Sequence, residues 1–229
     1  ADATVTVEPY RLFMPIIARN FTPVSYLQVA HLAPFAEDAS VTIRLNGVDA
    51  LTDVGYGDST AYIELDPGEY LVQIIPSGST TVAIEATVDL EAGVHYTAIA
   101  AGDGVNQDLE LKALEDDLTP PAAGQFHLRV GHLAPFAAGS ATADVRLQDG
   151  TPLLEDVDFG DITGFIPLAA GEYDLKITTP GGGTTLIDPP PVTFTAGQIL
   201  SAFATGDGVN QDLGVFALPT GAPGFFVFP

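Results

Sequence analysis

The chain contains two copies of one sequence unit, and this repetition constrains its fold more than any other feature. The string HLAPFA occurs at residues 31–36 and again at 132–137. The longer string GDGVNQDL occurs at residues 102–109 and again at 206–213. Because repeated sequence folds into repeated structure, we expect most of the chain to form two copies of one domain of about a hundred residues.

Composition limits the classes of partner. A chain of 229 residues with 46% hydrophobic content is long enough for two domains that each bury a core. It has no cysteine, which excludes disulfides and thiolate metal sites. Seven basic against thirty acidic residues give a formal charge of −23, which repels phosphate backbones and anionic membrane surfaces. We therefore expect no nucleic-acid partner. We also expect no membrane span, because the apolar run at 12–18 is shorter than the roughly 20 residues that a span needs.

Apolar and polar residues alternate with a period of two from about Tyr26 onward, and no stretch has a helical period. In residues 41–45, for example, Val41, Ile43 and Leu45 lie on one face of a strand. Similar runs occur at 60–65, 69–75, 80–90, 94–101 and 109–114, and in the second copy at 144–148, 162–168, 172–178, 184–195, 199–204 and 213–218. About seven short strands per copy predict an all-β chain of two tandem immunoglobulin-like Greek-key β-sandwiches with an extended N-terminal strand.

Two further patterns give the domain organisation. The segments LDPGEY at 65–70 and LAAGEY at 168–173 are typical of a tyrosine corner, so we expect structural roles for Tyr70 and Tyr173. An acidic run followed by Pro120-Pro121 has the composition of a short stiff linker. The predicted parts are an apolar arm at 1–24, a first repeat at 25–118, a linker at 119–125 and a second repeat with an apolar tail at 126–229.

The order of these signatures resembles the bacterial family known as domain of unknown function 4397. That family carries a strand ending in His, a Pro-containing loop, a strand ending in Asp-Gly or Asn-Gly, a Tyr-Gly pair and Leu-Pro-Ala-Gly-x-Tyr. The matching residues are 31–34, 46–47, 56–57 and 65–70, then 132–135, 149–150, 159–160 and 168–173. The family usually has an Asp soon after the loop Pro, where this chain has Phe35 and Phe136. The resemblance implies secreted tandem β-sandwich modules at bacterial surfaces, without known enzymatic activity.

The histidines invite a metal hypothesis that the strand period argues against. His31 and His132 are equivalent in the two copies. His127 and His132 lie five residues apart on one predicted strand, so their side chains point to opposite faces and cannot easily share an ion. We expect His31 and His132 to have a structural role, with each imidazole tying its loop to a backbone carbonyl.

The two GDGVNQDL loops gather oxygen-bearing side chains of the kind that calcium binds, although their spacing does not fit an EF-hand. The same side chains can instead bond to their own backbone and form turns. Both interpretations remain open for Asp103, Asn106 and Asp108 in the first loop and Asp207, Asn210 and Asp212 in the second.

No catalytic constellation is recognisable. A nucleophile elbow, a phosphate-binding loop and a carboxylate pair at a known spacing are all missing from the sequence. We therefore expect neither enzymatic activity nor a cofactor. The opening Ala-Asp-Ala is compatible with a chain from which a signal peptide has been removed, so we expect an extracellular, cell-surface protein.

An apolar arm precedes the repeats. Residues 10–18 place apolar side chains on both faces of a predicted strand, and such a strand needs cover on both sides. Burial of each large side chain is worth roughly 1.5 to 3 kcal/mol, so the arm should dock. The tail is equally apolar. The candidate assembly residues are Leu12, Phe13, Met14, Ile16 and Ile17 in the arm and Phe225, Phe226 and Phe228 in the tail.

Two functions follow from where the arm docks. In the first case, the arm enters a groove of a neighbouring copy by strand addition. Such head-to-tail contacts do not form a closed ring, so the chain would be the subunit of an extracellular filament that is a homopolymer of itself. If the arm folds back onto its own first domain, the chain is a monomeric cell-surface binding or adhesion module. Such a module would recognise a glycan or a protein through the HLAPFA and GDGVNQDL loops.

Overall fold

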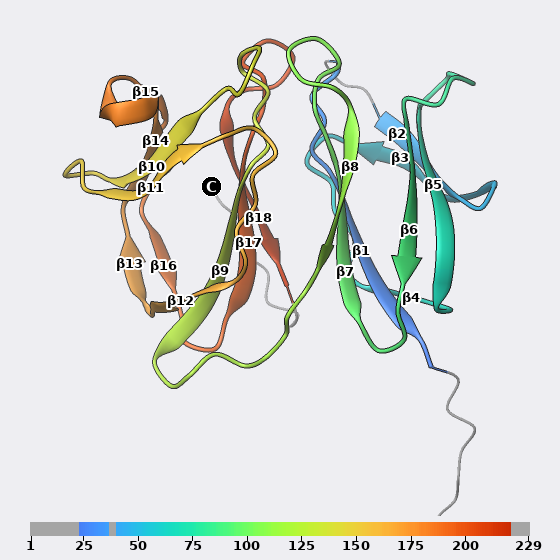
Figure 1. The fold of residues 1–229 in the computed structure, drawn as a ribbon, viewed down its shortest axis with the longest axis horizontal. Helices are drawn as coiled ribbons and strands as arrows, with labels where there is room; N and C mark the ends of the chain where they lie inside the picture. The colour runs from blue at the N-terminus through green and yellow to red at the C-terminus, as the bar shows by residue number, and fades with distance from the viewer. Residues whose placement is uncertain (1–22, 37–39, 221–229) are drawn as a thin grey trace, which may run out of the picture.

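The computed structural model describes residues 23–36 and 40–220. It is all-β, as predicted, and consists of two β-sandwiches side by side (Figure 1). Within the described part of the chain, no helix has the length and apolar character that crossing a membrane requires. The immunoglobulin-like order of strands stays a prediction.

The first sandwich is built from β1 to β8 and the second from β9 to β18. The first contains β1 (Ser25–His31), β2 (Ser40–Leu45), β3 (Val48–Gly55), β4 (Ile63–Leu65), β5 (Gly68–Pro76), β6 (Ile84–Leu90), β7 (His95–Ala101) and β8 (Glu110–Glu115). The second contains β9 (Gln125–His132), β10 (Ala143–Leu147), β11 (Pro152–Val157), β12 (Ile166–Ala169), β13 (Gly171–Tyr173), β14 (Leu175–Thr178), β15 (Thr185–Ile187), β16 (Val192–Phe194), β17 (Ile199–Thr205) and β18 (Gly214–Pro219), with a 3-10 turn η1 (Pro180–Gly182).

Both sandwiches have the same sheet order. An inner sheet, β4-β1-β7-β8, packs on an outer sheet, β3-β2-β5-β6, in the first copy. In the second copy the inner sheet is β12-β9-β17-β18 and the outer sheet is β11-β10-β14-β15, with β13 and β16 as a separate pair. The central pairs, β1 with β7 and β9 with β17, are parallel. Leu27 pairs with Tyr96 and Leu128 with Leu200, so the register is also repeated.

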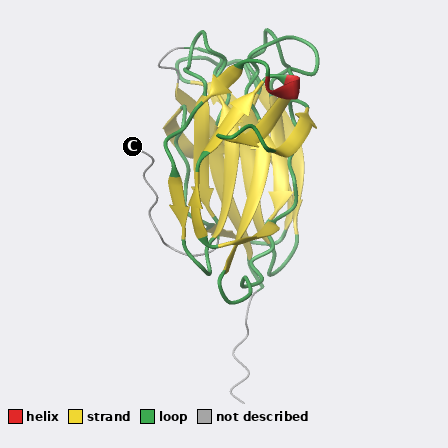
Figure 2. Cartoon of the chain, turned by 90° about the vertical axis from the view of Figure 1, so that its left-hand side faces the viewer, coloured by secondary structure: helices red, strands yellow, loops and turns green. Residues whose placement is uncertain are grey.

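The two inner sheets face one another (Figure 1), and the two sandwiches lie one behind the other in the end-on view of Figure 2. The inner sheets share a core. Alternation along β7 explains this double burial: Ala98 and Ala100 belong to the core of the first sandwich, whereas Ile99 and Ala101 belong to the shared cluster. The buried members of the shared cluster are Ala30, Leu32, Ile99, Ala101, Leu133, Phe203 and Leu218. The two repeats therefore form one packed body.

The structure differs from the predicted strands in three places, and two of these differences have a physical cause in the sequence. β3 and β11 were not predicted, because they are exposed edge strands without apolar alternation, and register shifts interrupt their pairing. The expected single strand at 184–195 is wrong: it is divided into β15 and β16. The three prolines at 189–191 lie between these strands, and proline offers no N–H to a sheet ladder. The predicted strand at 172–178 is likewise divided, into β13 and β14.

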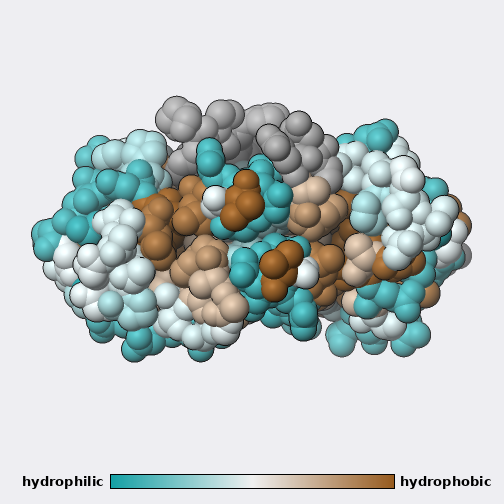
Figure 3. Space-filling view, turned by 90° about the horizontal axis from the view of Figure 1, so that it is seen from above, coloured by the Kyte–Doolittle hydropathy of each residue, from teal (hydrophilic) through white to brown (hydrophobic). Residues whose placement is uncertain are grey.

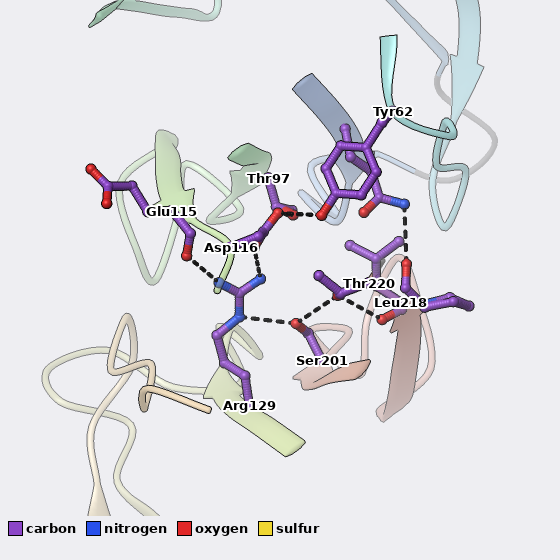
Figure 4. A network of polar contacts seen from close by, with 10 residues as sticks. Tyr62, Thr97, Glu115, Asp116, Arg129, Ser201, Leu218 and Thr220 are labelled. Carbon is purple, nitrogen blue, oxygen red and sulfur yellow. Dashed lines mark hydrogen bonds and ion pairs between the residues drawn. The ribbon is translucent and has the colours of Figure 1, made fainter. Parts of the chain in front are cut away.

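A buried ion pair joins the two sandwiches at their interface (Figure 4). Arg129 of β9 donates from Nη2 to Asp116 Oδ1 at 2.5 Å, and the two side chains are 3% and 0% exposed. The guanidinium also donates to Ser201 Oγ and to the carbonyl of Glu115, and it lies 4.6 Å from the Phe165 ring centre.

The other carboxylate oxygen of Asp116 is satisfied within the first sandwich. It accepts hydrogen bonds from the hydroxyls of Tyr62 and Thr97, both at 2.6 Å. Burial and the neighbouring carboxylate raise the pKa of Tyr62, so its hydroxyl stays protonated and donates. Each charge at this interface thus has both a counter-ion and hydrogen-bond partners, which is the condition for keeping an ion pair out of water.

Removal of Asp116 should therefore weaken the whole molecule. We expect Asp116→Ala to lower the free energy of unfolding by about 3 to 5 kcal/mol, because Arg129 is left buried without a counter-ion. Urea denaturation followed by circular dichroism measures the loss. Arg44→Ala, which breaks an ion pair whose side chains are 34% and 49% exposed, is the control and should cost less than about 1 kcal/mol. Equal losses in the two variants would contradict a structural role for the buried pair.

Candidate functional site

The four repeated loops meet at one end of the molecule, which we call the apex. It comprises residues 32–36 and 133–141, after β1 and β9, and residues 102–109 and 206–213, after β7 and β17. Parallel strands end at the same edge of a sheet, so the parallel pairing of β1 with β7 and of β9 with β17 brings these loops together. They lie at the top of Figure 1.

Each GDGVNQDL loop is held by its first aspartate. Asp103 Oδ1 accepts the backbone N–H groups of Val105, Asn106 and Gln107 at 3.0, 2.8 and 2.9 Å, and its Oδ2 accepts Asn106 Nδ2 at 2.8 Å. Asp207 makes the same four bonds in the second loop. Burial acts to raise the pKa of both aspartates, but these N–H donors lower it below its ordinary value. The carboxylates therefore stay ionised and fix the loops.

The glycine that begins each loop is required by the backbone. Gly102 and Gly206 have φ angles of +86° and +87°, in the left-handed region that favours glycine. A Cβ at either position would lie 2.0 Å from the carbonyl oxygen of Asp108 or Asp212. The two loops therefore share one conformation that requires glycine at this position.

Each loop is also fastened to the other repeat. Asn106 Nδ2 donates to the carbonyl of Pro135, and Asn210 Nδ2 donates to the carbonyl of Pro34, at 3.1 and 3.0 Å. Gln107 Nε2 adds bonds to the carbonyls of Ala137 and Gly139. The exchange is reciprocal, as in the interface of a symmetric dimer, so the apex has an approximate two-fold symmetry within one chain.

The tips of the two loops expose apolar side chains. Val105 and Val209 are 87% and 85% exposed, more than any other large apolar side chain among residues 23–36 and 40–220. Seen from above in Figure 3, the middle of this face has small apolar spots surrounded by hydrophilic residues. The apex thus presents two equivalent apolar tips on loops that are already rigid, which reduces the ordering cost of binding.

The calcium candidates are bonded within their own loops. Among the described residues, no group of three or more acidic or histidine side chains is placed to hold a metal ion. Asp103 with Asn106, and Asp207 with Asn210, are brought together as hydrogen-bonded pairs. Asp108 and Asp212 contribute backbone carbonyls that pack on the glycines. The geometry is that of the second interpretation, side chains bonded to their own turns.

The two equivalent histidines are buried beneath the apex. His132 donates from Nε2 to the carbonyl of Ala141 at 2.7 Å and accepts the N–H of Ala134, which is the carbonyl contact expected of it. His31 is 1% exposed, and neither nitrogen of its imidazole ring has a hydrogen bond to a described residue. The residue equivalent to Ala141 is Ala39, which lies outside the described ranges.

Phe35 and Phe136 stand where the family usually has an aspartate, and they cover the two histidines. The ring centres of Phe35 and His31, and of Phe136 and His132, are 5.6 Å apart in both copies. Sequence reasoning missed this contact. The tyrosine corners are formed as their spacing predicts: the hydroxyls of Tyr70 and Tyr173 donate to the carbonyls of Asp66 and Ala169 at 2.9 and 2.8 Å.

A second feature, also missed from the sequence, is a cavity of about 80 Å³ between the sheets of the second sandwich. The first sandwich has one continuous core, whereas the core of the second is divided into two clusters, and the cavity touches both. An unfilled apolar cavity of this size costs about 2 kcal/mol, at roughly 24 cal/mol per Å³. The lining residues used below are Val145, Val215, Pro189, Pro190 and Leu200.

The cavity has a cause in the sequence of the two copies. Superposing their registers makes Val41, Ile43, Tyr96 and Leu111 equivalent to Ala143, Val145, Leu200 and Val215. The second copy has the smaller side chain at all four positions. Ser25 and Leu90 correspond in the same registers to the larger Phe126 and Phe194, so the sequence comparison alone does not predict the cavity.

Comparison with known proteins places the chain in a family. The model of a family described as domain of unknown function (DUF4397) matches residues 25–140 and 136–223. The chain belongs to the DUF4397 family. No curated protein matches the sequence.

Solved structures with a related arrangement are distant from this DUF4397 chain. One is a family CBM26 module of Amy13K from Eubacterium rectale in complex with maltoheptaose, with 10% identity, 86% of this chain and 98% of that chain covered, and a TM-score of 0.29. Another is a streptococcal virulence factor described by its alpha-glucan binding, with 11% identity, 84% and 96% coverage and a TM-score of 0.28. A third is the Bacillus anthracis TIE protein, with 14% identity, 81% and 34% coverage and a TM-score of 0.23.

The assembly candidates of the arm and tail lie outside the described residues. This applies to Leu12, Phe13, Met14, Ile16 and Ile17 and to Phe225, Phe226 and Phe228.

Burial of His31 should make stability depend on pH. Burial lowers the pKa of His31 to about 4, with a smaller opposing effect from Asp58. Between the unfolded pKa of about 6.5 and this value, only the unfolded chain binds the proton, so stability falls as the pH falls through that window. The contribution is on the order of 3 kcal/mol. His31→Gln should therefore flatten the dependence of the free energy of unfolding on pH between 6.5 and 4, measured by denaturation at several pH values. Parallel curves for both proteins would show that His31 does not titrate in this way.

Proposed function

We propose that the protein is an extracellular binding module that contacts its partner through the apex. The observation that carries this proposal is the pair of equivalent loops whose tips, Val105 and Val209, are exposed to solvent. Hydrogen bonds to Asp103 and Asp207 hold both loops in place. A single exposed valine is ordinary on a protein surface. Here two exposed valines lie on loops of the same sequence, and each loop is held by four hydrogen bonds to one aspartate. Pre-organised loops of this kind are where binding residues concentrate.

The symmetry of the apex restricts the class of partner that fits it. Two equivalent tips related by an approximate two-fold fit a partner that repeats along its length or is itself two-fold symmetric, because both tips can then make the same contact. Among the described residues, no large aromatic side chain is exposed. Exposed aromatic rings give binding sites their large flat contacts. A protein surface with shallow apolar hollows therefore fits the apex better than the face of a sugar ring.

Replacement of both tips tests the proposal. We expect Val105→Asp with Val209→Asp to weaken binding to cell envelopes of the source organism by at least tenfold, which corresponds to about 1.4 kcal/mol. Sedimentation with the envelopes measures binding. The matched control is Val48→Asp, which changes a valine that is 70% exposed at the β2–β3 turn.

Two treatments of the envelopes separate the partner classes. Loss of binding after protease digestion supports a protein partner, whereas competition by maltoheptaose or another soluble glycan supports a glycan. If the double variant binds as well as the unaltered protein, the apex is not the binding site.

A second candidate function is the filament subunit, in which the arm at residues 10–18 enters another copy. The observation that favours it is the incomplete packing of the second sandwich, which leaves an unfilled apolar space between its sheets. An apolar arm and an apolar vacancy in one chain are complementary features.

Deletion of the arm tests this candidate. We expect a chain that lacks residues 1–20 to stay folded and monomeric, because the deletion removes the inserting strand and leaves both described sandwiches intact. Native protein should form filaments under negative-stain microscopy. Filaments that persist after the deletion would contradict assembly through the arm.

A further inference from the structure

The side of the second sandwich between β18 and the divided strand β15/β16 differs from its counterpart in the first. In the first sandwich β6 is continuous and packs against β8, which closes this side. In the second, neither β15 nor β16 makes comparable contact with β18. The cavity is lined there by Pro189 and Pro190 from the interruption and by Val215 from β18.

Among the described strands, β18 is an edge of its sheet. It reads GVFALP, without a charged residue. The equivalent edge strand β8 reads ELKALE and carries Glu110, Lys112 and Glu115. Charged residues on an edge strand prevent the addition of further strands, so β8 is protected and β18 is not.

Both faces of β18 carry apolar side chains that pack in a core. The inner sheet of the second sandwich has its own core and cavity on one side and the first sandwich on the other. Along β18, Val215 lines the cavity, whereas Leu218 belongs to the shared cluster between the sandwiches. The adjoining position therefore calls for a strand that is apolar on both faces, which is the pattern of residues 10–18.

We propose that the open side beside β18 is the acceptor for residues 12–17 of a second copy of the chain, which add as an edge strand and place alternate side chains in the cavity. This inference rests on the filament candidate above and names its acceptor. Charge supports a contact between copies: Arg11 and Arg19 flank the apolar segment and account for two of only seven basic residues in a chain of net charge −23. Pro15, which has no N–H, fits an added strand that pairs on one side only.

Cysteine cross-linking between two single variants tests the acceptor directly, because the chain has no native cysteine. One protein carries Met14→Cys and the other, of different mass through a tag, carries Val215→Cys. After mixing under assembly conditions and mild oxidation, we expect a disulfide-linked heterodimer on a non-reducing gel. The matched control is Leu111→Cys, the equivalent position on β8, which should give at least tenfold less heterodimer.

Filling the cavity gives a second measurement. Val145→Ile with Val215→Leu installs the residues of the first copy, and Ile43→Val with Leu111→Val is the reciprocal control. We expect the filled variant to melt at a higher temperature than the unaltered protein while its polymer yield falls at least tenfold. The control should polymerise normally.

The outcomes separate this inference from the filament candidate. Filaments that form without a Met14–Val215 cross-link, and that tolerate the filled cavity, would overturn the acceptor and leave the filament. Absence of filaments together with absence of the heterodimer would overturn both. If a chain with both cysteines gives only an internally linked monomer, the arm occupies its own copy and the inference is wrong.

Discussion

The burial of both inner sheets on both faces is the constraint on which the rest of the structure depends. Each inner sheet has its own outer sheet on one side and the other inner sheet on the other, so its central strands must be apolar at successive positions. β7 meets this demand with Ala98 and Ala100 facing one core and Ile99 and Ala101 facing the other. The same contact brings the four loops of the apex together and encloses the Arg129–Asp116 pair. Without it, the two repeats would be separate modules and the four loops would not meet.

The two copies have kept one topology while their packing has diverged. Replacement of Val41, Ile43 and Leu111 by smaller residues in the second copy, with the proline interruption of its outer sheet, exchanges a continuous core for a divided one. A protein interior normally lacks voids of this size, and the cost of about 2 kcal/mol is large beside the 5 to 15 kcal/mol by which domains are stable. Such a cost is offset if the void receives side chains from elsewhere, which is the physical basis for an acceptor in the second copy only.

The sequence predicted the features that are local and periodic. The repeat, the half-buried strands and the tyrosine corners each depend on residues within a few positions of one another, and they are found where expected. The exposed strands β3 and β11 escaped prediction because their residues do not alternate, and their existence depends on pairing with β2 and β10. The bonds from Asn106 to Pro135 and from Asn210 to Pro34 could not be predicted, because they depend on how the two repeats pack. Asp116 lies in an acidic run that resembles a solvated linker, yet burial against Arg129 decides its role.

The apex and the proposed acceptor share one strand. β18 begins directly after the apex loop at 206–213, and Leu213 and Val215 pack in the same cluster of the second core. A strand added beside β18 would extend that cluster, whereas the loop that carries Val105 continues into β8, whose side is already closed. The four bonds to Asp207 already hold the loop that carries Val209, so such an addition would change the packing behind this tip and not its conformation. On the two proposals together, a copy within a filament and a free copy would present the same pre-organised apex.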